Sequence, residues 1–197
     1  MKKEISNWGK YPKMYVEEIS FTDKDIIKKT LQEKNELIAR GNGRCYGDAS
    51  LANNTISTLK YDKILGFDRE KGTFKCQSGV TLDEILDITV PDGWFLPVTP
   101  GTKYITVGGA VASDVHGKNH HVDGSFSNHL INVEILLADG EIVNCNPYLN
   151  NDLFNATCGG MGITGLILSA EFNLKRIETA YIKQKQIKAK NLEEILD

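Results

Sequence analysis

The residues best suited to bind an anion lie in one short segment, Arg40-Gly-Asn-Gly-Arg-Cys-Tyr-Gly-Asp48. Its glycines follow a run, Glu36-Leu-Ile-Ala39, that is typical of a short buried strand. A glycine-rich loop lets backbone N–H groups turn toward one point, where a phosphate is a natural ligand. The spacing is not the dinucleotide-binding fingerprint, because the third glycine comes one residue late and no helix start follows. Alone, the segment fits a phosphate loop and a tight turn about equally well.

The histidines are the second group of chemically capable residues, and all of them fall between positions 116 and 129. His116 and His120 have the i, i+4 spacing that can place two metal ligands on one helical face. Gly117 and Asn119 disfavour a helix there, and neither a carboxylate nor a cysteine stands at a metal-motif spacing from the pair. We therefore expect no metal, and we expect His129 to make structural hydrogen bonds.

A longer string of unusual composition runs from Pro100 to His129 and contains PGT, TVGGAVASDVHGKNHH and GSFSNH. These strings resemble the diphosphate- and flavin-binding segment of the decaprenylphosphoryl-ribose 2'-oxidases, and RGNGRCYGD resembles the first flavin loop of that family. Residues 153–167, LFNATCGGMGITGLI, resemble the family's later glycine-rich strand against the cofactor. The motifs keep the family's order from about Asn7 to about Tyr181. The sequence is thus similar to the PCMH-type FAD-binding domain of vanillyl-alcohol-oxidase-type flavoenzymes.

The resemblance implies a set of cofactor-binding residues, taken over position by position. Backbone N–H groups from Gly41 to Gly47, and those of Gly108 and Gly109, are expected to hold the FAD diphosphate. The full implied set is Arg40, Gly41, Asn42, Gly43, Arg44, Cys45, Tyr46, Gly47, Asp48, Ala49, Gly101, Thr106, Val107, Gly108, Gly109, Ser113, Asp114, Val115, His116 and Ile167.

Arg44 stands where the wider superfamily often has a histidine bonded covalently to the flavin. An arginine cannot form that bond, so we expect non-covalent FAD, with Cys45 as a small residue beside the ring rather than a cysteinyl link. His116 and Lys118 match residues at the reactive side of the flavin and are the catalytic candidates. A histidine there can donate to the substrate or help to accept a hydroxyl proton.

The activity implied by the resemblance is that of an FAD-dependent oxidoreductase that oxidises a sugar hydroxyl by hydride transfer to flavin. The strings HGKNHH and GSFSNH favour a sugar on a polyprenyl-phosphate carrier as the substrate of the full-length protein, with a reductase as a further candidate partner. An aldonolactone or alditol oxidase with the same FAD fold is the alternative enzyme. A flavin carrier or sensor without enzymatic activity also stays open. Because this chain supplies mainly the cofactor half, we expect it to be inactive alone.

The elements that position these residues are visible in local patterns. Thr22 as N-cap and apolar residues at helical spacing predict a helix over roughly residues 23–34. Hairpins are predicted over 64–77 and, around Asp139-Gly140, over 132–145. The capping box Thr81-Leu-Asp-Glu84 predicts a helix to about Thr89. This mixture favours an α+β fold over a doubly wound parallel sheet.

The resemblance divides this α+β fold into two subdomains within residues 7–178. A small parallel sheet is expected in residues 7–60, and a larger antiparallel sheet with helices in residues 61–178. Residues 191–197 begin a capped amphipathic helix that the sequence does not continue. We therefore expect residues 179–197 to begin a substrate-binding or cap domain.

Composition limits the remaining function classes. A net charge of -3 over 197 residues gives no basic field for nucleic acid. The N-terminal region lacks the apolar segment of a signal peptide, and no later stretch is long enough to cross a bilayer. The four cysteines are scattered without a CxxC pair, which favours reduced thiols and a cytoplasmic protein.

Overall fold

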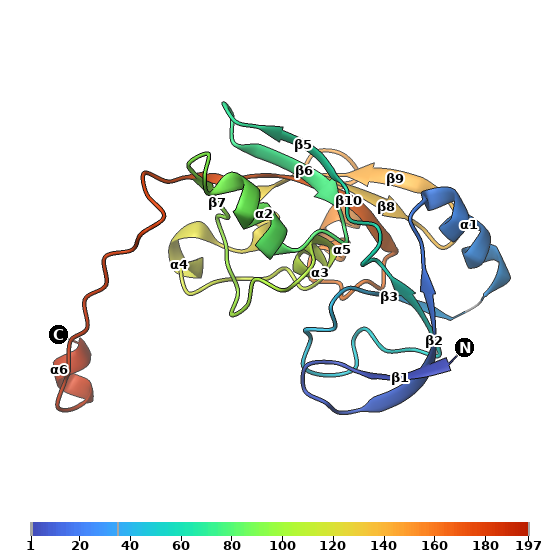
Figure 1. Ribbon diagram of the computed structural model, residues 1–197, viewed down its shortest axis with the longest axis horizontal. Coiled ribbons are helices and arrows are strands. Elements are labelled where there is room, and N and C mark those ends of the chain that lie inside the picture. Colours follow the sequence, from blue (N-terminus) through green and yellow to red (C-terminus); the bar gives the residue numbers. More distant parts are fainter. Residues whose placement is uncertain (1, 35, 197) are drawn as a thin grey trace.

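The first sheet is four-stranded, in the order β1-β2-β4-β3, in a computed structural model that describes residues 2–34 and 36–196 (Figure 1). Its elements are β1 (Lys2–Ser6), β2 (Lys13–Ser20), β3 (Leu37–Arg40) and β4 (Asn54–Ser57), with helix α1 (Lys24–Glu33) between β2 and β3. Strands β2 and β3 both pair in parallel with β4, as predicted. Strand β1 adds an antiparallel edge from residues before Asn7, so the sheet is mixed.

Helix α1 confirms the predicted helix but not its predicted cap. Asp23, not Thr22, is the N-cap, because its extended backbone lets its carboxylate accept a hydrogen bond from the Asp25 N–H at 2.7 Å. The helix buries Ile27 against the sheet, where Phe21 stacks on Tyr61 with ring centroids 4.9 Å apart.

The second sheet is five-stranded and antiparallel, in the order β5-β6-β10-β8-β9. Its strands are β5 (Ile64–Asp68), β6 (Thr73–Gln77), β8 (Leu130–Leu136), β9 (Ile142–Cys145) and β10 (Leu166–Asn173). Both predicted hairpins are confirmed, since β5 pairs with β6 and β8 pairs with β9. The central strand β10 joins the two hairpins by pairing with β6 and β8. The α+β fold class is therefore confirmed.

The helices between these strands are short. They are α2 (Leu82–Thr89), α3 (Val107–Ala112), α4 (His120–Asp123), η1 (Phe126–His129), a 3-10 helix, and α5 (Asn151–Thr157). The predicted capping box of α2 is confirmed: the side chains of Thr81 and Glu84 each bond the other's backbone N–H. The third family motif is a strand only from Leu166 onward, because its first residues form α5 and a turn.

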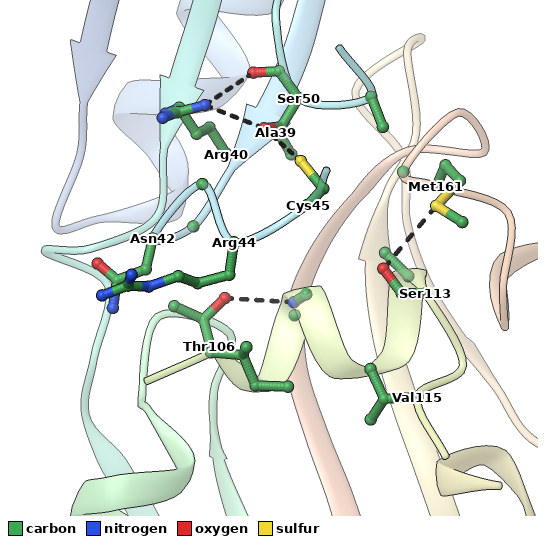
Figure 2. A pocket seen from close by; sticks show the side chains of 18 of the residues that line it. Ala39, Arg40, Asn42, Arg44, Cys45, Ser50, Thr106, Ser113, Val115 and Met161 are labelled. Atoms are coloured by element: carbon green, nitrogen blue, oxygen red, sulfur yellow. Dashed lines mark hydrogen bonds between the residues drawn. The ribbon is translucent and has the colours of Figure 1, made fainter. Parts of the chain in front are cut away.

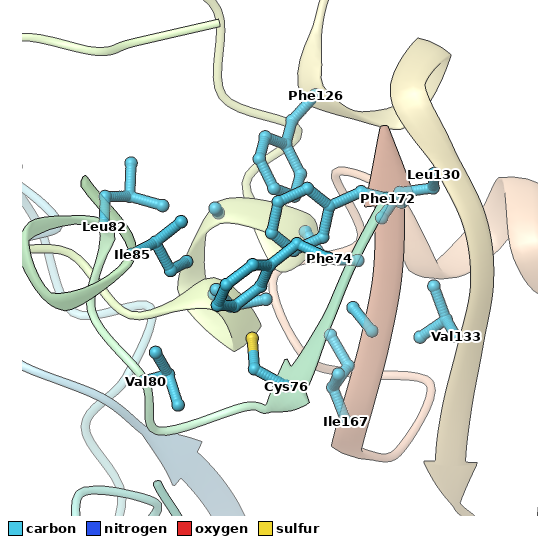
Figure 3. Packing of buried hydrophobic residues seen from close by; sticks show 14 of the residues in the cluster. Phe74, Cys76, Val80, Leu82, Ile85, Phe126, Leu130, Val133, Ile167 and Phe172 are labelled. Atoms are coloured by element: carbon cyan, nitrogen blue, oxygen red, sulfur yellow. The ribbon is translucent and has the colours of Figure 1, made fainter. Parts of the chain in front are cut away.

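The two faces of the second sheet bury different partners. Residues alternate between faces along a strand, so Ile167 packs in the large cluster beneath α2 and α3, whereas Leu166 and Leu168 pack against the first sheet. Phe74 and Phe126 both lean on Phe172 in the large cluster, with ring centroids 5.9 Å and 5.3 Å from it (Figure 3). The second cluster joins the two sheets, and it fixes the space between them.

The chain leaves this body after β11 (Lys175–Arg176), which pairs with β7 (Trp94–Phe95). It then runs extended, away from both sheets, to helix α6 (Leu192–Leu196), whose residues are all exposed (Figure 1). That residues 179–197 begin a further domain stays a prediction. Within residues 2–34 and 36–196, no helix has the length and hydropathy needed to cross a bilayer. All four cysteines have free thiols.

Replacing Phe172 by alanine tests the large cluster. Phe172 is fully buried and touches two other aromatic rings, so F172A is expected to lower the free energy of unfolding by about 3–5 kcal/mol. Urea unfolding followed by circular dichroism measures the change. Y148A is the control, since Tyr148 is 98% exposed and its loss should change stability by less than about 0.5 kcal/mol. Equal effects of the two substitutions would contradict this packing.

Candidate functional site

A cavity of about 590 Å³ opens between the first sheet and α3. Three segments line it: the loop after β3, the stretch from Pro100 to Val115, and the turn that leads into β10 (Figure 2). The implied cofactor residues that line it are Arg40, Gly41, Asn42, Gly43, Arg44, Cys45, Tyr46, Gly47, Ala49, Gly101, Thr106, Gly108, Gly109, Ser113, Val115 and Ile167. Segments more than a hundred residues apart in sequence thus meet at one space.

The loop over residues 41–47 lines this cavity along its whole length. In the described part of the chain, none of its backbone N–H groups donates to another protein group. Gly43 has a φ of 59°, a left-handed conformation that glycine adopts without strain. Gly41 lies against the Thr106 side chain so closely that an added Cβ would overlap it. The loop is therefore held open toward the cavity and close to α3.

Helix α3 keeps its own amides occupied. Thr106 is the N-cap, and its Oγ1 accepts from the Gly109 N–H at 3.2 Å. The Gly108 N–H donates to the Ser78 carbonyl at 2.9 Å, and the N–H of Val107 donates to the Val80 carbonyl at 2.8 Å. The two glycine amides that the resemblance assigns to the diphosphate are thus bonded within the chain. Val107 itself is fully buried in the core, outside the cavity lining.

Asn7 anchors the far side of the glycine loop, although no sequence pattern pointed to it. Its side chain is almost fully buried, and its Nδ2 donates to the Gly47 carbonyl at 2.6 Å. Its Oδ1 accepts from Ser50 Oγ at 3.0 Å and from the guanidinium of Arg40. Asp48, which the resemblance included, is exposed and does not line the cavity. The loop is therefore fixed by the N-terminal strand region as well as by β3.

Asp114 follows Ser113, which lines the cavity, but its carboxylate makes hydrogen bonds to residues outside the cavity lining. Its carboxylate accepts from Ser125 Oγ at 2.8 Å, and from the N–H and Oγ of Ser127 at 2.8 Å and 3.0 Å. It has a φ of 38°, a strained conformation for a residue other than glycine. The implied cofactor residue Asp114 thus ties the end of α3 to the GSFSNH segment.

The two catalytic candidates, His116 and Lys118, are exposed and lie outside the cavity lining. The His116 ring meets the His120 ring edge to face, with centroids 5.6 Å apart. His129 makes the structural hydrogen bond that we expected, because its Nε2 lies 2.7 Å from the Asp123 carbonyl. No cluster of three His, Cys, Asp or Glu residues suited to a metal occurs in the portion of the chain that the structure describes.

Asp123 fixes the loop that carries these histidines. The ammonium of Lys175 lies 2.8 Å from the carboxylate, and Asn119 donates to the same group at 2.7 Å. These contacts, led by the one to Lys175, lower the pKa of Asp123 from its ordinary value. Asn119 also donates to the Pro97 carbonyl at 2.9 Å. The loop is therefore tied both to β11 and to the segment before the cavity.

Several residues that line the cavity had not been selected from the sequence. Trp8 packs edge to face on Tyr46, with centroids 5.3 Å apart, and Met161 accepts a hydrogen bond from Ser113 Oγ at 3.8 Å. The others are Ala39, Ser50, Thr58, Pro100, Thr102, Ile105, Ala112, Gly162, Gly165 and Leu166. Met161 had a weak signal, its place in the third glycine cluster. Trp8 had none, because only the fold brings the N-terminus to the loop.

Gly41 and Gly47 form a matched pair for testing the loop in the absence of ligand. G41A is expected to lower the free energy of unfolding by about 1–3 kcal/mol, because the added Cβ pushes Thr106 out of its capping position. G47A is the control, since a Cβ there meets nothing within 4 Å. Urea titration of both proteins measures the difference. Equal stabilities would show that Gly41 does not lie against α3.

Comparison with known proteins finds one family and several relatives whose names are those of oxidases and dehydrogenases. Residues 24–146 match the family described as FAD binding domain. Decaprenylphosphoryl-beta-D-ribose oxidase of Mycolicibacterium smegmatis is 37% identical over 91% of this chain and 41% of its own length. D-lactate dehydrogenase of Anaerostipes hadrus is 30% identical over 88% of the chain and 38% of its own. L-gulonolactone oxidase of Mus musculus is 24% identical, over 84% and 39%.

This chain spans less than half the length of each of these relatives. The family match covers more than half of the chain itself, and it includes both the glycine loop and α3. The geometry and the likeness agree on the same segments. The chain belongs to the FAD-binding domain family, and its cofactor is FAD.

Proposed function

We propose that the chain holds FAD non-covalently in the cavity between the 41–47 loop and α3, as the cofactor half of an oxidoreductase acting on a sugar hydroxyl. The observation that carries this proposal is the row of backbone amides at the cavity wall that have no acceptor in residues 2–34 and 36–196. A diphosphate offers several charged acceptor oxygens to such a row.

The rest of the cavity also suits this cofactor. Ile105, Val115 and Ile167 give it apolar walls, and its volume of about 590 Å³ is in the range of cofactor and ligand sites. We place the diphosphate of FAD at the 41–47 loop. The apolar walls of the cavity then lie along the other parts of FAD. Asp114 and Val107 then act as supports of the site rather than as contacts.

Non-covalent attachment is supported by Arg44 and Cys45, which stand where the wider superfamily often has the histidine that bonds covalently to the flavin. Arg44 is not a nucleophile, and its guanidinium lies over the Tyr104 ring at 5.9 Å from the centroid. The Cys45 thiol lies 3.4 Å from Ser50 Oγ, in the network beneath the loop (Figure 2). Both arrangements favour a dissociable cofactor.

We further propose that His116 and Lys118 act on the substrate. His116 directly follows Val115, which lines the cavity, and its ring is exposed and open to an approaching hydroxyl. A neutral imidazole can take the hydroxyl proton, and the Lys118 ammonium can bind an oxygen of the substrate. FAD, when bound, supplies the hydride acceptor.

The substrate class that we favour is a sugar on a polyprenyl-phosphate carrier. The support is the 37% identity to a decaprenylphosphoryl-beta-D-ribose oxidase over most of this chain. A small aldonolactone is the second candidate, supported by the weaker likeness to L-gulonolactone oxidase.

We propose that residues 7–60 and 61–178 are the two FAD-binding subdomains and that residues 179–197 begin the substrate-binding part. We also propose that the protein is cytoplasmic and that a reductase is its electron partner.

The mode of FAD attachment has a direct test. Purified protein is expected to be yellow and to release all of its flavin into the supernatant when it is precipitated by acid, because no covalent bond holds it. Flavin absorbance of the two fractions measures the release. Protein that stays fluorescent in a denaturing gel would contradict non-covalent binding, and C45A would then show whether Cys45 makes the link. Colourless protein with no affinity for added FAD would contradict the cofactor proposal itself.

A further inference from the structure

Arg40 lies beneath the glycine loop and is held there entirely by neutral groups. Its Nη1 donates to Ser50 Oγ at 3.0 Å and to Asn7 Oδ1, and its Nη2 donates to the Ser6 carbonyl at 2.9 Å. The guanidinium lies so close to Gly43 that a Cβ there would overlap it. The cation therefore lies directly against the loop that lines the cavity (Figure 2).

This arginine forms no ion pair with a carboxylate in the part of the chain that the structure describes. By contrast, Arg69 at the surface pairs with Asp92 at 2.8 Å. Arg40 is half-buried, and its burial lowers the pKa of the guanidinium, while Cys45 and the carboxylate of Glu18 oppose this effect from a distance; an arginine remains charged at neutral pH. A partly buried charge without a carboxylate in direct contact costs free energy, and a ligand that brings negative charge next to it lowers that cost.

We infer that Arg40 is a positioning residue whose charge, not paired with a carboxylate in the described chain, favours a diphosphate-bearing ligand. It acts by supporting the 41–47 loop and by attracting the diphosphate electrostatically. The inference rests on the proposed function, because the diphosphate in question is that of FAD. The neutral partners Asn7, Ser50 and Ser6 orient the guanidinium without cancelling its charge. The loop amides then contact the diphosphate, while the cation beneath them strengthens the attraction.

The first experiment compares FAD binding by the wild-type apoprotein, R40K and R40Q. Quenching of flavin fluorescence gives each dissociation constant at low and at high salt. R40Q is expected to bind FAD at least about tenfold more weakly at low salt, and the loss should shrink at high salt because the missing term is electrostatic. R40K keeps the charge and should lose clearly less. R69Q removes a remote positive charge and should stay within about twofold of wild type.

A purely structural role predicts something different. R40K and R40Q would then lose affinity by the same factor at every salt concentration, and that result would overturn the inference. R40Q binding FAD as tightly as wild type would also overturn it. Failure of the wild-type protein to bind FAD at all would instead overturn the proposed function.

A second pair of variants keeps Arg40 in place, in case its replacement disturbs folding. Ser50 Oγ is a neutral acceptor for the guanidinium, so S50D offers a carboxylate to Arg40, while S50N offers a neutral group of the same shape. S50D is expected to bind FAD at least about fivefold more weakly than S50N at low salt, because it neutralises the cation. Circular dichroism melts confirm that both fold. Equal affinities for FAD would overturn the inference.

Discussion

Backbone amides at the wall of a cavity need an acceptor, and those of residues 41–47 have none among the described residues of the chain. The surrounding structure keeps this loop from folding back onto itself. Gly41 is pressed against Thr106 on one side, and Asn7 holds the carbonyl of Gly47 on the other. The second hydrophobic cluster, with Ile56 of the first sheet and Leu168 of the second, fixes the spacing of the two sheets.

The two glycine-rich motifs therefore differ in their physical roles. In the first, the backbone amides have no acceptor among the residues that the structure describes. In the second, Gly108 and Gly109 bond to Ser78 and Thr106, so their amides hold α3 in place, and an added Cβ at Gly108 would press on Ser78. A sequence motif can thus lie at a cofactor site because it shapes the wall of the site, without each residue making a contact.

Local signals in the sequence were sufficient for much of the fold. The capping box at Thr81 and the hairpin around Asp139-Gly140 involve residues close in sequence, and both are confirmed. The N-cap of α1 was misplaced by one residue, because Thr22 and Asp23 are both good caps and only the backbone conformation distinguishes them. No comparable local signal predicts the edge strand β1. Its antiparallel pairing depends on its partner β2 rather than on its own residues.

The candidate site was predictable to a similar extent. The resemblance identified the glycine loop and α3, and most of those residues line the cavity. Asn7 and Trp8 were missed, because their contacts join segments about forty residues apart. Asp114 was selected as a cofactor residue, yet its carboxylate is occupied by Ser125 and Ser127. Side-chain direction, which decides such cases, depends on tertiary packing rather than on spacing.

In the proposed complex, free amides of the 41–47 loop hold the FAD diphosphate, whereas the amides at the start of α3 remain bonded within the chain. Amide hydrogen exchange, measured with and without FAD, tests it at residue level. FAD is expected to slow exchange strongly from Gly41 to Gly47 and to change it little at Gly108 and Gly109. Slower exchange at Gly108 and Gly109 with none at the loop would contradict it.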